Sequence, residues 1–478
     1  METVRRARSP WVVLVATSLA VFAVFLDTTI LFVAFPAIRA DFSDVSASSL
    51  SWVLNAYTIV FAALLIPAGR LADRVGRRRT FLAAVVLFTV ASMLCGVAPT
   101  AGLLVLARVL QAVGAAALVP SSLALVLQSF PREKVPVAVA IWGAIAAVAG
   151  AAGPTLGALV VEHFGWRWAF FINLPVGIVS FVMGRRVLPE WREENPGRLP
   201  DLWGALLLGG GLALLAYGIV QTNEWGWVDL RVAGTLLLAA VLIGAFVWRC
   251  STVSNPLLDL RLFESRSFRW ANSGLLVFSV GFNAMFLGNV LFLTQVWGYT
   301  VLRAGMAIAV GPLIVAITAP FFGRLAGRIG QRRLLIPGGL VWGTGGLWLI
   351  TQATTGADYL GVYLPAVCMT GIGVALCLPQ LSSAAVQGLP PAQFGAGSAV
   401  TQAVRNLGAT LGVALVLAFT ADVTAASALD AFHRVWYLLV ASGVAVTLVA
   451  VRLPRGGRVS TVSTSAARQR HRDRSYGT

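Results

Sequence analysis

The sequence predicts an all-α protein that crosses a membrane many times. Of its 478 residues, 58% are hydrophobic and only 12% are charged, whereas a soluble globular domain averages about 25% charged residues. Uncharged apolar runs recur along the chain, and most approach the ~20 residues that an α-helix needs to cross the hydrocarbon core. A basic string between two such runs, at residues 69–82, returns in related form at residues 323–335. This repeat indicates two related halves, which is the plan of many secondary transporters.

We expect fourteen membrane-spanning helices, an even number that leaves both termini on one side of the membrane. Short basic loops stay in the cytoplasm under the positive-inside rule. Because Arg5, Arg6 and Arg8 precede the first span, and the loops at 74–79 and 324–333 are also basic, that side is expected to be the cytoplasm. The expected spans are residues 11–38, 51–71, 79–98, 101–122, 136–161, 166–188, 202–222, 230–249, 268–295, 305–325, 333–353, 359–381, 394–421 and 431–451.

Two polar stretches divide these spans into groups. A charged and proline-broken stretch, 185–201, follows the sixth span, and a second polar stretch, 250–269, follows the eighth. We expect the second stretch to form a short amphipathic segment on the inner surface. The sequence therefore predicts an N-terminal six-helix bundle (11–188), two extra spans (202–249), a C-terminal six-helix bundle (268–451) and a disordered basic cytoplasmic tail (452–478).

The net charge of +17 does not indicate a nucleic-acid partner. The basic residues lie in short loops and at the termini, and the sequence lacks a basic face interleaved with aromatic residues, which a single-strand binder needs. Basic residues in such places orient the spans and face the anionic inner leaflet. We therefore expect a monomer in the cell membrane whose partner is the lipid bilayer, with no nucleic acid.

No motif in the sequence indicates an enzyme, a cofactor or a metal. The glycine-rich runs lie in apolar helices and lack the G-x-x-x-x-G-K-[ST] pattern of a phosphate-binding loop. The three histidines are too scattered for a metal site, and the four cysteines have no C-x-x-C spacing, so they are expected to be packing residues. Any transport would then use an ion gradient rather than ATP.

Ionisable side chains within the spans mark the candidate site. Burying one costs at least ~2.5–3.5 kcal/mol on insertion scales, so each is a functional candidate. Asp27 lies about 16 Å below the outer end of the first span, and Arg108 lies about 10 Å below the outer end of the fourth. The two are therefore able to pair at one interior cavity, and the alternative is a static salt bridge that only fixes helix packing. Arg405 lies nearer the inner end of the thirteenth span, and Trp142, inside the fifth, is a weaker candidate for a cavity wall.

The fifth span also contains the string G-A-A-G-P-T-L-G at residues 150–157. Small residues three or four positions apart let helices approach closely, and a proline weakens the backbone hydrogen-bond ladder. On its own this string predicts a packing motif.

These motifs resemble those of the major facilitator superfamily, in particular its fourteen-helix drug:proton antiporter branch. Residues 69–82 fill the family pattern G-x-L-x-D-R-x-G-R-R at every key position, and residues 166–177, WRWAFFINLPVG, form the most branch-specific string. Residues 26–36 and 405–412 resemble motifs of the first and thirteenth helices. The remaining matches are Trp52, Tyr57 and Pro67 in the second span, Arg108, Gln111 and Gly114 in the fourth, and Gly153, Pro154 and Gly157 in the fifth.

The resemblance implies the major facilitator fold, in which two bundles rock about a central cavity and proton entry is coupled to export of a lipophilic compound. Asp27 then carries the proton and Arg108 tunes it, because burial disfavours the charged carboxyl and a nearby arginine favours it. The candidate coupling and cavity residues are Asp27, Arg108, Gln111, Tyr57 and Trp142. The candidate inner gate is Gly69, Asp73, Arg74, Gly76, Arg77, Arg78 and Arg405, and the antiporter motif is Gly150, Gly153, Pro154 and Gly157.

Departures from the family pattern change some of these expectations. Phe32 replaces an asparagine, which makes the cavity less polar, and Ala112 and Ala158 replace glycines, which stiffens close contacts. Gly327 replaces the acid of the second loop, so only the first copy can form an acid-mediated gate. Asp27 is then the only clear membrane acid, which favours neutral or singly charged substrates over dications.

The sequence thus favours a proton-coupled antiporter that exports lipophilic drugs or antibiotics, with protons and a lipophilic small molecule as its ligands. Three alternatives stay open. They are export of an endogenous metabolite or siderophore, uptake rather than export, and a non-transporting membrane scaffold or sensor of transporter ancestry.

Overall fold

The computed structural model describes residues 9–131, 134–190, 201–226, 228–253, 256–387, 389, 393–420 and 428–454. Within these ranges every regular element is a helix and no strand occurs. This agrees with the all-α prediction, because a spanning segment must satisfy its backbone hydrogen bonds internally. The expected disordered tail, 452–478, lies almost wholly outside the described residues.

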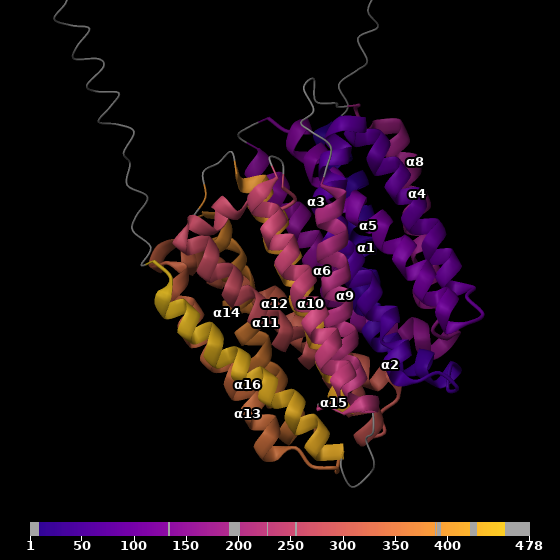
Figure 1. Ribbon diagram of the computed structural model, residues 1–478, viewed down its shortest axis with the longest axis vertical. Coiled ribbons are helices and arrows are strands. Elements are labelled where there is room, and N and C mark those ends of the chain that lie inside the picture. Colours follow the sequence, from indigo (N-terminus) through magenta and orange to yellow (C-terminus); the bar gives the residue numbers. More distant parts are fainter. Residues whose placement is uncertain are drawn as a thin grey trace, which may run out of the picture.

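The first part of the chain forms the N-terminal bundle, drawn in indigo and violet on the right of Figure 1. Its longest members pack against one another in the pairs α4–α5, α1–α6 and α3–α5. The elements are α1 (Pro10–Asp41), α2 (Ala47–Leu50), α3 (Trp52–Val75), α4 (Arg77–Gly96), α5 (Ala101–Ser129), α6 (Val135–Phe164), α7 (Trp168–Phe171) and α8 (Asn173–Val187).

The last part forms the C-terminal bundle, in orange and yellow on the left of Figure 1. Its main pairs are α13–α16, α13–α14 and α11–α15. The helices are α11 (Arg266–Leu291), α12 (Val301–Ile329), α13 (Gln331–Gln352), α14 (Leu364–Gln387), α15 (Phe394–Thr420) and α16 (Ala428–Arg452), with π-helical turns at Phe292–Val296 and Tyr359–Tyr363.

A helical pair, α9 (Leu202–Trp225) and α10 (Leu230–Thr252), lies between the bundles, where α9 packs on both α3 and α15. Asp201 fixes its inner end: its carboxylate accepts from the backbone N–H of Gly204 at 3.0 Å and pairs with Arg249 of α10 at 2.8 Å. A 3₁₀ turn, Leu260–Glu264, follows the pair and buries Leu262 in the C-terminal bundle.

Thirteen described helices are long and apolar enough to cross a membrane, or fourteen if α6 counts as one bent span. This supports the fourteen spans that the sequence predicts. The bend in α6 measures 41° and lies between Gly150 and Ala152. Pro154 accounts for it, because proline has no N–H to bond to the carbonyl four residues earlier and its ring clashes with that carbonyl.

We call the side that holds the described ends, Ser9 and Pro454, the inner side of the molecule (upper in Figure 1) and the opposite side the outer side. On the outer side the two bundles share one hydrophobic core, which contains Phe32 of α1 together with Leu287 of α11 and Ala304 of α12. On the inner side each bundle has its own core, apart from Ile66 of α3, which reaches the C-terminal one. The two bundles therefore share one apolar core on the outer side and have mostly separate cores on the inner side.

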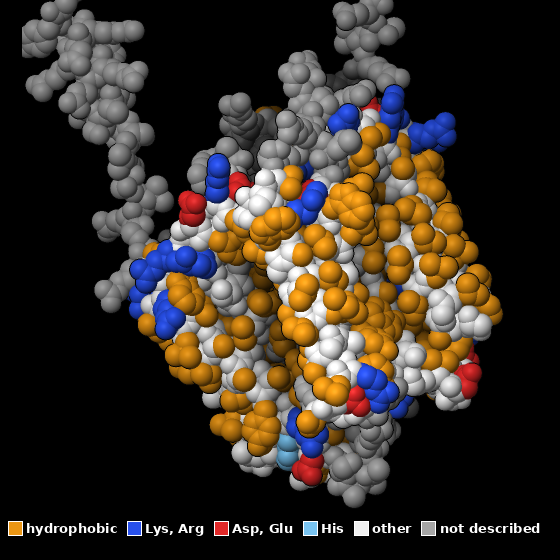
Figure 2. All heavy atoms as spheres, viewed as in Figure 1, with side chains coloured by type: hydrophobic (Ala, Val, Ile, Leu, Met, Phe, Trp, Pro, Cys, Tyr) orange, Lys and Arg blue, Asp and Glu red, His pale blue; other side chains and the backbone are white. Residues whose placement is uncertain are grey.

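The surface agrees with a membrane location. In Figure 2, apolar side chains cover the middle of the visible face and charged side chains lie near its two ends. Such a distribution places the apolar middle in the hydrocarbon layer.

The basic string 69–82 differs from the expected loop. Asp73 and Arg74 lie in the last turn of α3, and Arg77 already begins α4, so the connection between these helices is Gly76 alone. Gly69 does not turn the chain, because it lies inside α3 against Pro120 of α5. Gly76 makes the turn at a φ of 117°, in the left-handed region that glycine adopts without strain. In the second copy Gly330 makes the equivalent turn, at a φ of 86°.

Candidate functional site

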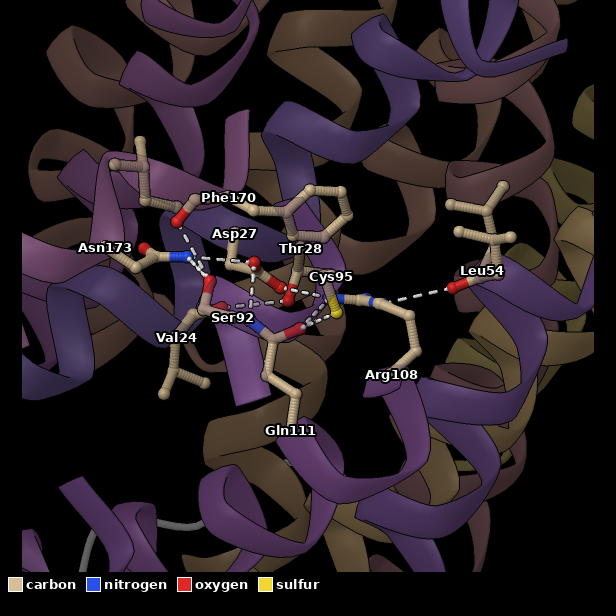
Figure 3. A network of polar contacts seen from close by, with 12 residues as sticks. Val24, Asp27, Thr28, Leu54, Ser92, Cys95, Arg108, Gln111, Phe170 and Asn173 are labelled. Carbon is tan, nitrogen blue, oxygen red and sulfur yellow. Dashed lines mark hydrogen bonds and ion pairs between the residues drawn. The ribbon is translucent and has the colours of Figure 1, made fainter. Parts of the chain in front are cut away.

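Asp27 is the centre of a buried polar network inside the N-terminal bundle (Figure 3). Arg108 of α5 donates from Nη1 to Asp27 Oδ2 at 2.6 Å. One turn further along α5, Gln111 donates from Nε2 to Asp27 Oδ1 at 2.9 Å, and Asn173 of α8 donates to the same oxygen at 3.0 Å. The carboxylate thus accepts three side-chain hydrogen bonds from two helices, and its exposed fraction is 2%.

Arg108 is held by more than its ion pair. Its Nη1 also donates to Gln111 Oε1 at 2.6 Å, and its Nε donates to the backbone carbonyl of Val53 at 3.1 Å. The guanidinium carbon lies 4.0 Å from the ring centroid of Tyr57, which is a cation–π contact. These contacts come from α3 and α5, so the arginine is fixed in one orientation against Asp27.

Further polar groups from α4 support the network. Asn173 donates a second hydrogen bond to Ser92 Oγ at 2.9 Å, and Ser92 in turn donates to the carbonyl of Phe170 at 2.9 Å. The thiol of Cys95 lies 3.7 Å from Gln111 Oε1 and donates weakly to it. Five helices (α1, α3, α4, α5 and α8) and the short α7 therefore meet at one polar point in an otherwise apolar bundle.

The network has a defined chemistry. Its two opposite charges compensate each other, and breaking such a buried pair by removing one partner costs about 3–5 kcal/mol. A proton added to Asp27 neutralises the carboxylate and leaves the charge of Arg108 without its partner. The arrangement can therefore exist in two charge states that differ by one proton.

Of the five candidate coupling residues, the structure brings four together: Asp27, Arg108, Gln111 and Tyr57. It places Trp142 elsewhere. The indole N–H of Trp142 donates to Ser122 Oγ at 3.2 Å, on the contact between α5 and α6, and its ring packs on the inner-side core of the N-terminal bundle.

The antiporter motif lies where α6 passes between α1 and α12. A Cβ added to Gly153 would lie 2.7 Å from Thr29 Cβ, and one added to Gly157 would lie 3.2 Å from Ile30 Cα. The carbonyl oxygen of Pro154 would be 2.8 Å from a Cβ added to Gly305 of α12. Gly150, in contrast, has open space around it. The motif therefore permits the close approach of α6 to α1 in its own bundle and to α12 in the other bundle.

The candidate gate residues gather at the inner end of α3 and α4, with one exception. Asp73 Oδ1 pairs with Arg77 at 2.7 Å, Arg78 donates to the carbonyl of Arg185 at 2.9 Å, and Arg74 is exposed. Within the described part of the chain, Arg77 is the only ion-pair partner of Asp73. Arg405 does not join this group, since it lies near the middle of α15.

Comparisons with known proteins identify the family. The family model described as Major Facilitator Superfamily matches residues 17–413 and, in an overlapping match, 273–472. The chain belongs to the major facilitator superfamily. Among solved superfamily-type structures, a POT family peptide transporter in an auto-inhibited form is 18% identical, with a TM-score of 0.66 over 95% of this chain and 98% of that one. At this identity the likeness concerns the fold alone.

Curated superfamily relatives are more similar in sequence. The multidrug resistance protein Stp of Mycobacterium tuberculosis (strain CDC 1551 / Oshkosh) is 36% identical over 410 residues, which are 86% of this chain and 75% of that protein. The tetracenomycin C resistance and export protein of Streptomyces glaucescens is 32% identical over 412 residues, which are 85% of this chain and 75% of that protein.

Sequence reasoning missed two members of this superfamily protein's polar network. Asn173 was seen only as part of the string 166–177, although an amide directly after two phenylalanines and an isoleucine is a polar group in an apolar setting. Ser92 carries no such signal, because serine is common in spans and its hydroxyl normally bonds within its own helix. Cys95 was expected to be a packing residue; it is buried and free, and its thiol also contacts Gln111.

Proposed function

We propose that this protein exports lipophilic drugs or antibiotics across the cytoplasmic membrane in exchange for protons, by alternating access, with both termini in the cytoplasm. The observation that carries the proposal is the carboxylate of Asp27, buried at mid-depth with Arg108 as its charge partner. Buried ionisable groups inside a membrane bundle mark proton relays and substrate pathways. The names of the Stp and tetracenomycin relatives support drug or antibiotic export.

The position of Asp27 on α1 supports coupling between its proton and the movement of the bundles. One face of α1 carries Asp27 into the N-terminal bundle. Another face carries Phe32, whose ring lies 5.3 Å from that of Phe286 in the C-terminal bundle. Since both contacts involve the same rigid helix, separation of the outer halves acts directly on the segment that holds Asp27.

The proposed cycle follows from this linkage. In the outer-closed state, Arg108, Gln111 and Asn173 stabilise the charged carboxylate. When the outer halves separate, any lengthening of the Asp27–Arg108 contact disfavours the charged form and favours proton binding. Return to the outer-closed state restores the three donors and releases the proton on the inner side. Each state thus binds the proton with a different affinity, which is what coupling requires.

The alternative substrate is an endogenous metabolite or siderophore. The residues at the polar network are the same under both descriptions. A non-transporting scaffold is less well supported, because it needs no ionisable pair at mid-depth.

The experiment is a comparison of the wild type with Asp27→Asn. A host without its own exporters is tested against a panel of lipophilic antibiotics, and proton movement is then followed in proteoliposomes with a pH-sensitive dye. We expect the wild type to protect the host and to move protons when drug is added, and Asp27→Asn to do neither. Arg261→Gln, an exposed inner-surface substitution, is the control. Wild-type efflux and intact proton coupling in Asp27→Asn would show that Asp27 is only a structural partner of Arg108.

A further inference from the structure

Arg405 is a charged side chain in the middle of α15. It lies about 16 Å from the inner end of its helix. Among the described residues, no hydrogen bond or ion pair engages its guanidinium, and the guanidinium carbon lies 5.9 Å from the ring centroid of Phe25. An arginine at this depth costs at least ~2.5–3.5 kcal/mol, so its retention without a partner needs a reason.

The guanidinium points into the space between the two bundles. Phe25 belongs to α1 in the N-terminal bundle, whereas Arg405 belongs to the C-terminal one. The side chain is half-buried rather than fully buried, as are its neighbours Gln402 and Asn406. Each of the three side chains therefore keeps some surface that the described chain does not cover.

Arg405, Asn406 and Gln402 form one polar patch. Gln402 is three residues before Arg405 and four before Asn406, so its side chain neighbours both on the helix surface. Gln402 Nε2 donates to Asn406 Oδ1 at 3.2 Å, which uses the acceptor of that amide. The Asn406 Nδ2 group is buried and donates to nothing in the described chain. The patch therefore combines the free guanidinium of Arg405 with an unpaired amide group directly beside it.

The patch lies just inside the closed outer half. One turn beyond Asn406, Thr410 shares a hydrogen bond of 2.8 Å with Thr58 of α3, which joins the two bundles. The shared outer core continues from there with Val413 and Leu417 of α15. A molecule that approached from the inner side would meet the patch before the apolar core that the bundles share on the outer side.

We propose that Arg405 and Asn406 bind the anionic group of an exported substrate, so that the substrate class is a lipophilic acid with a carboxylate or similar single negative charge. Among the described residues, Asp27 is the only acid at mid-depth in the spans, and Arg108 already neutralises it. The space between the bundles therefore has a net positive charge, and Phe25 supplies an apolar contact for the rest of the molecule. This inference rests on the proposed export function and names its substrate.

The proposal is tested by binding to the full-length protein in nanodiscs of zwitterionic lipid, with empty nanodiscs as the blank. The three probes are 4-(1-pyrenyl)butyrate, its neutral primary amide and 4-(1-pyrenyl)butylammonium, which share one apolar body. A hydrogen bond between the Arg405 guanidinium and a carboxylate contributes more to affinity than one to a neutral amide. We therefore expect the carboxylate to bind about tenfold to a hundredfold more tightly than the amide. The ammonium compound is expected to bind least.

Variants assign the preference to the patch. Arg405→Gln should bind the carboxylate and the amide equally, with the affinity for the amide unchanged, and Arg405→Lys should keep part of the preference. Arg261→Gln removes one positive charge from the inner surface and should behave as the wild type. Equal binding of carboxylate and amide by the wild type, or an unchanged preference in Arg405→Gln, would overturn the proposal. The comparison of carboxylate and amide in the wild type does not depend on any variant folding. Binding is measured without a proton gradient, so the test also stands if the protein proves not to be an antiporter.

Discussion

Ala158 of α6 and Gly305 of α12 face each other across the outer contact between the two bundles, with no room for a second methyl group. A Cβ on Gly305 would meet Ala158 Cβ and would lie 2.8 Å from the carbonyl oxygen of Pro154. Ala158 replaces a glycine of the family motif, and the space it takes is supplied by the glycine on the facing helix. From the sequence we expected Ala158 to stiffen this helix contact. The structure shows that α6 and α12 still approach closely, because Gly305 leaves room for the Ala158 methyl group.

Gly305→Ala should weaken the outer-closed state. Adding a methyl group to a full contact costs about 1–3 kcal/mol, and here the cost falls on one of the two transport states. We expect slower export, and a larger fraction of molecules in which a cysteine placed on the outer half of α12 reacts with an external thiol reagent.

Gly323→Ala is the matched control, because it adds the same methyl group to the same helix at a glycine with nothing within 4 Å. Wild-type export by Gly305→Ala, with normal expression, would contradict the role of this contact in closing the outer side.

The fold was largely predictable, because a membrane span depends on the length of an uncharged apolar run, and that length can be read directly from the sequence. The depths of Asp27 and Arg108 along their spans allowed a pair, and the structure places them 2.6 Å apart. The role of the pair stays a prediction. Pro154 indicates a weak point in α6, although the angle of the bend depends on the helices that pack around it.

Other features depend on packing that a single sequence does not reveal. The depth of Trp142 allowed a cavity wall, but depth does not fix the direction around the helix, and the ring packs against α5 instead. Gly305 belongs to no recognised motif, and only the facing Ala158 gives it a role. The charged string 69–82 resembled a loop because its polar residues interrupt the apolar run, yet arginine is a good helix former and the helices continue to Gly76.

Asp73→Asn should reduce transport with little loss of stability. Its pair with Arg77 is half-exposed, and i,i+4 pairs at helix surfaces contribute only about 0.3–0.5 kcal/mol. In the described structure Asp73 forms an ion pair only with Arg77 of its own bundle, so a role of Asp73 in bracing the two bundles applies to another conformation. We expect normal expression and thermal stability, with a lower rate of drug efflux in cells.

Glu190→Gln provides the comparison for this variant. Glu190 lies at the same inner surface, 3.5 Å from Arg79, and removing its charge leaves Asp73 in place. If both variants export at the wild-type rate, Asp73 has no gating role, and if both are equally impaired, the effect comes from inner-surface charge in general.

Asn173→Leu should lower drug-driven proton flux without abolishing it. Asn173 donates one of the three hydrogen bonds that Asp27 accepts, and leucine keeps a similar volume but donates nothing. Because Arg108 and Gln111 still donate to the carboxylate, the loss of flux should be partial. Ser92→Ala is the control: it removes the group that positions Asn173 but leaves all three donors to Asp27, so a smaller loss is expected. The measurements are proton flux in proteoliposomes and the thermal stability of each variant. An equal loss of flux and of stability in both variants would mean that Asn173 supports the packing of α8 and not the proton on Asp27.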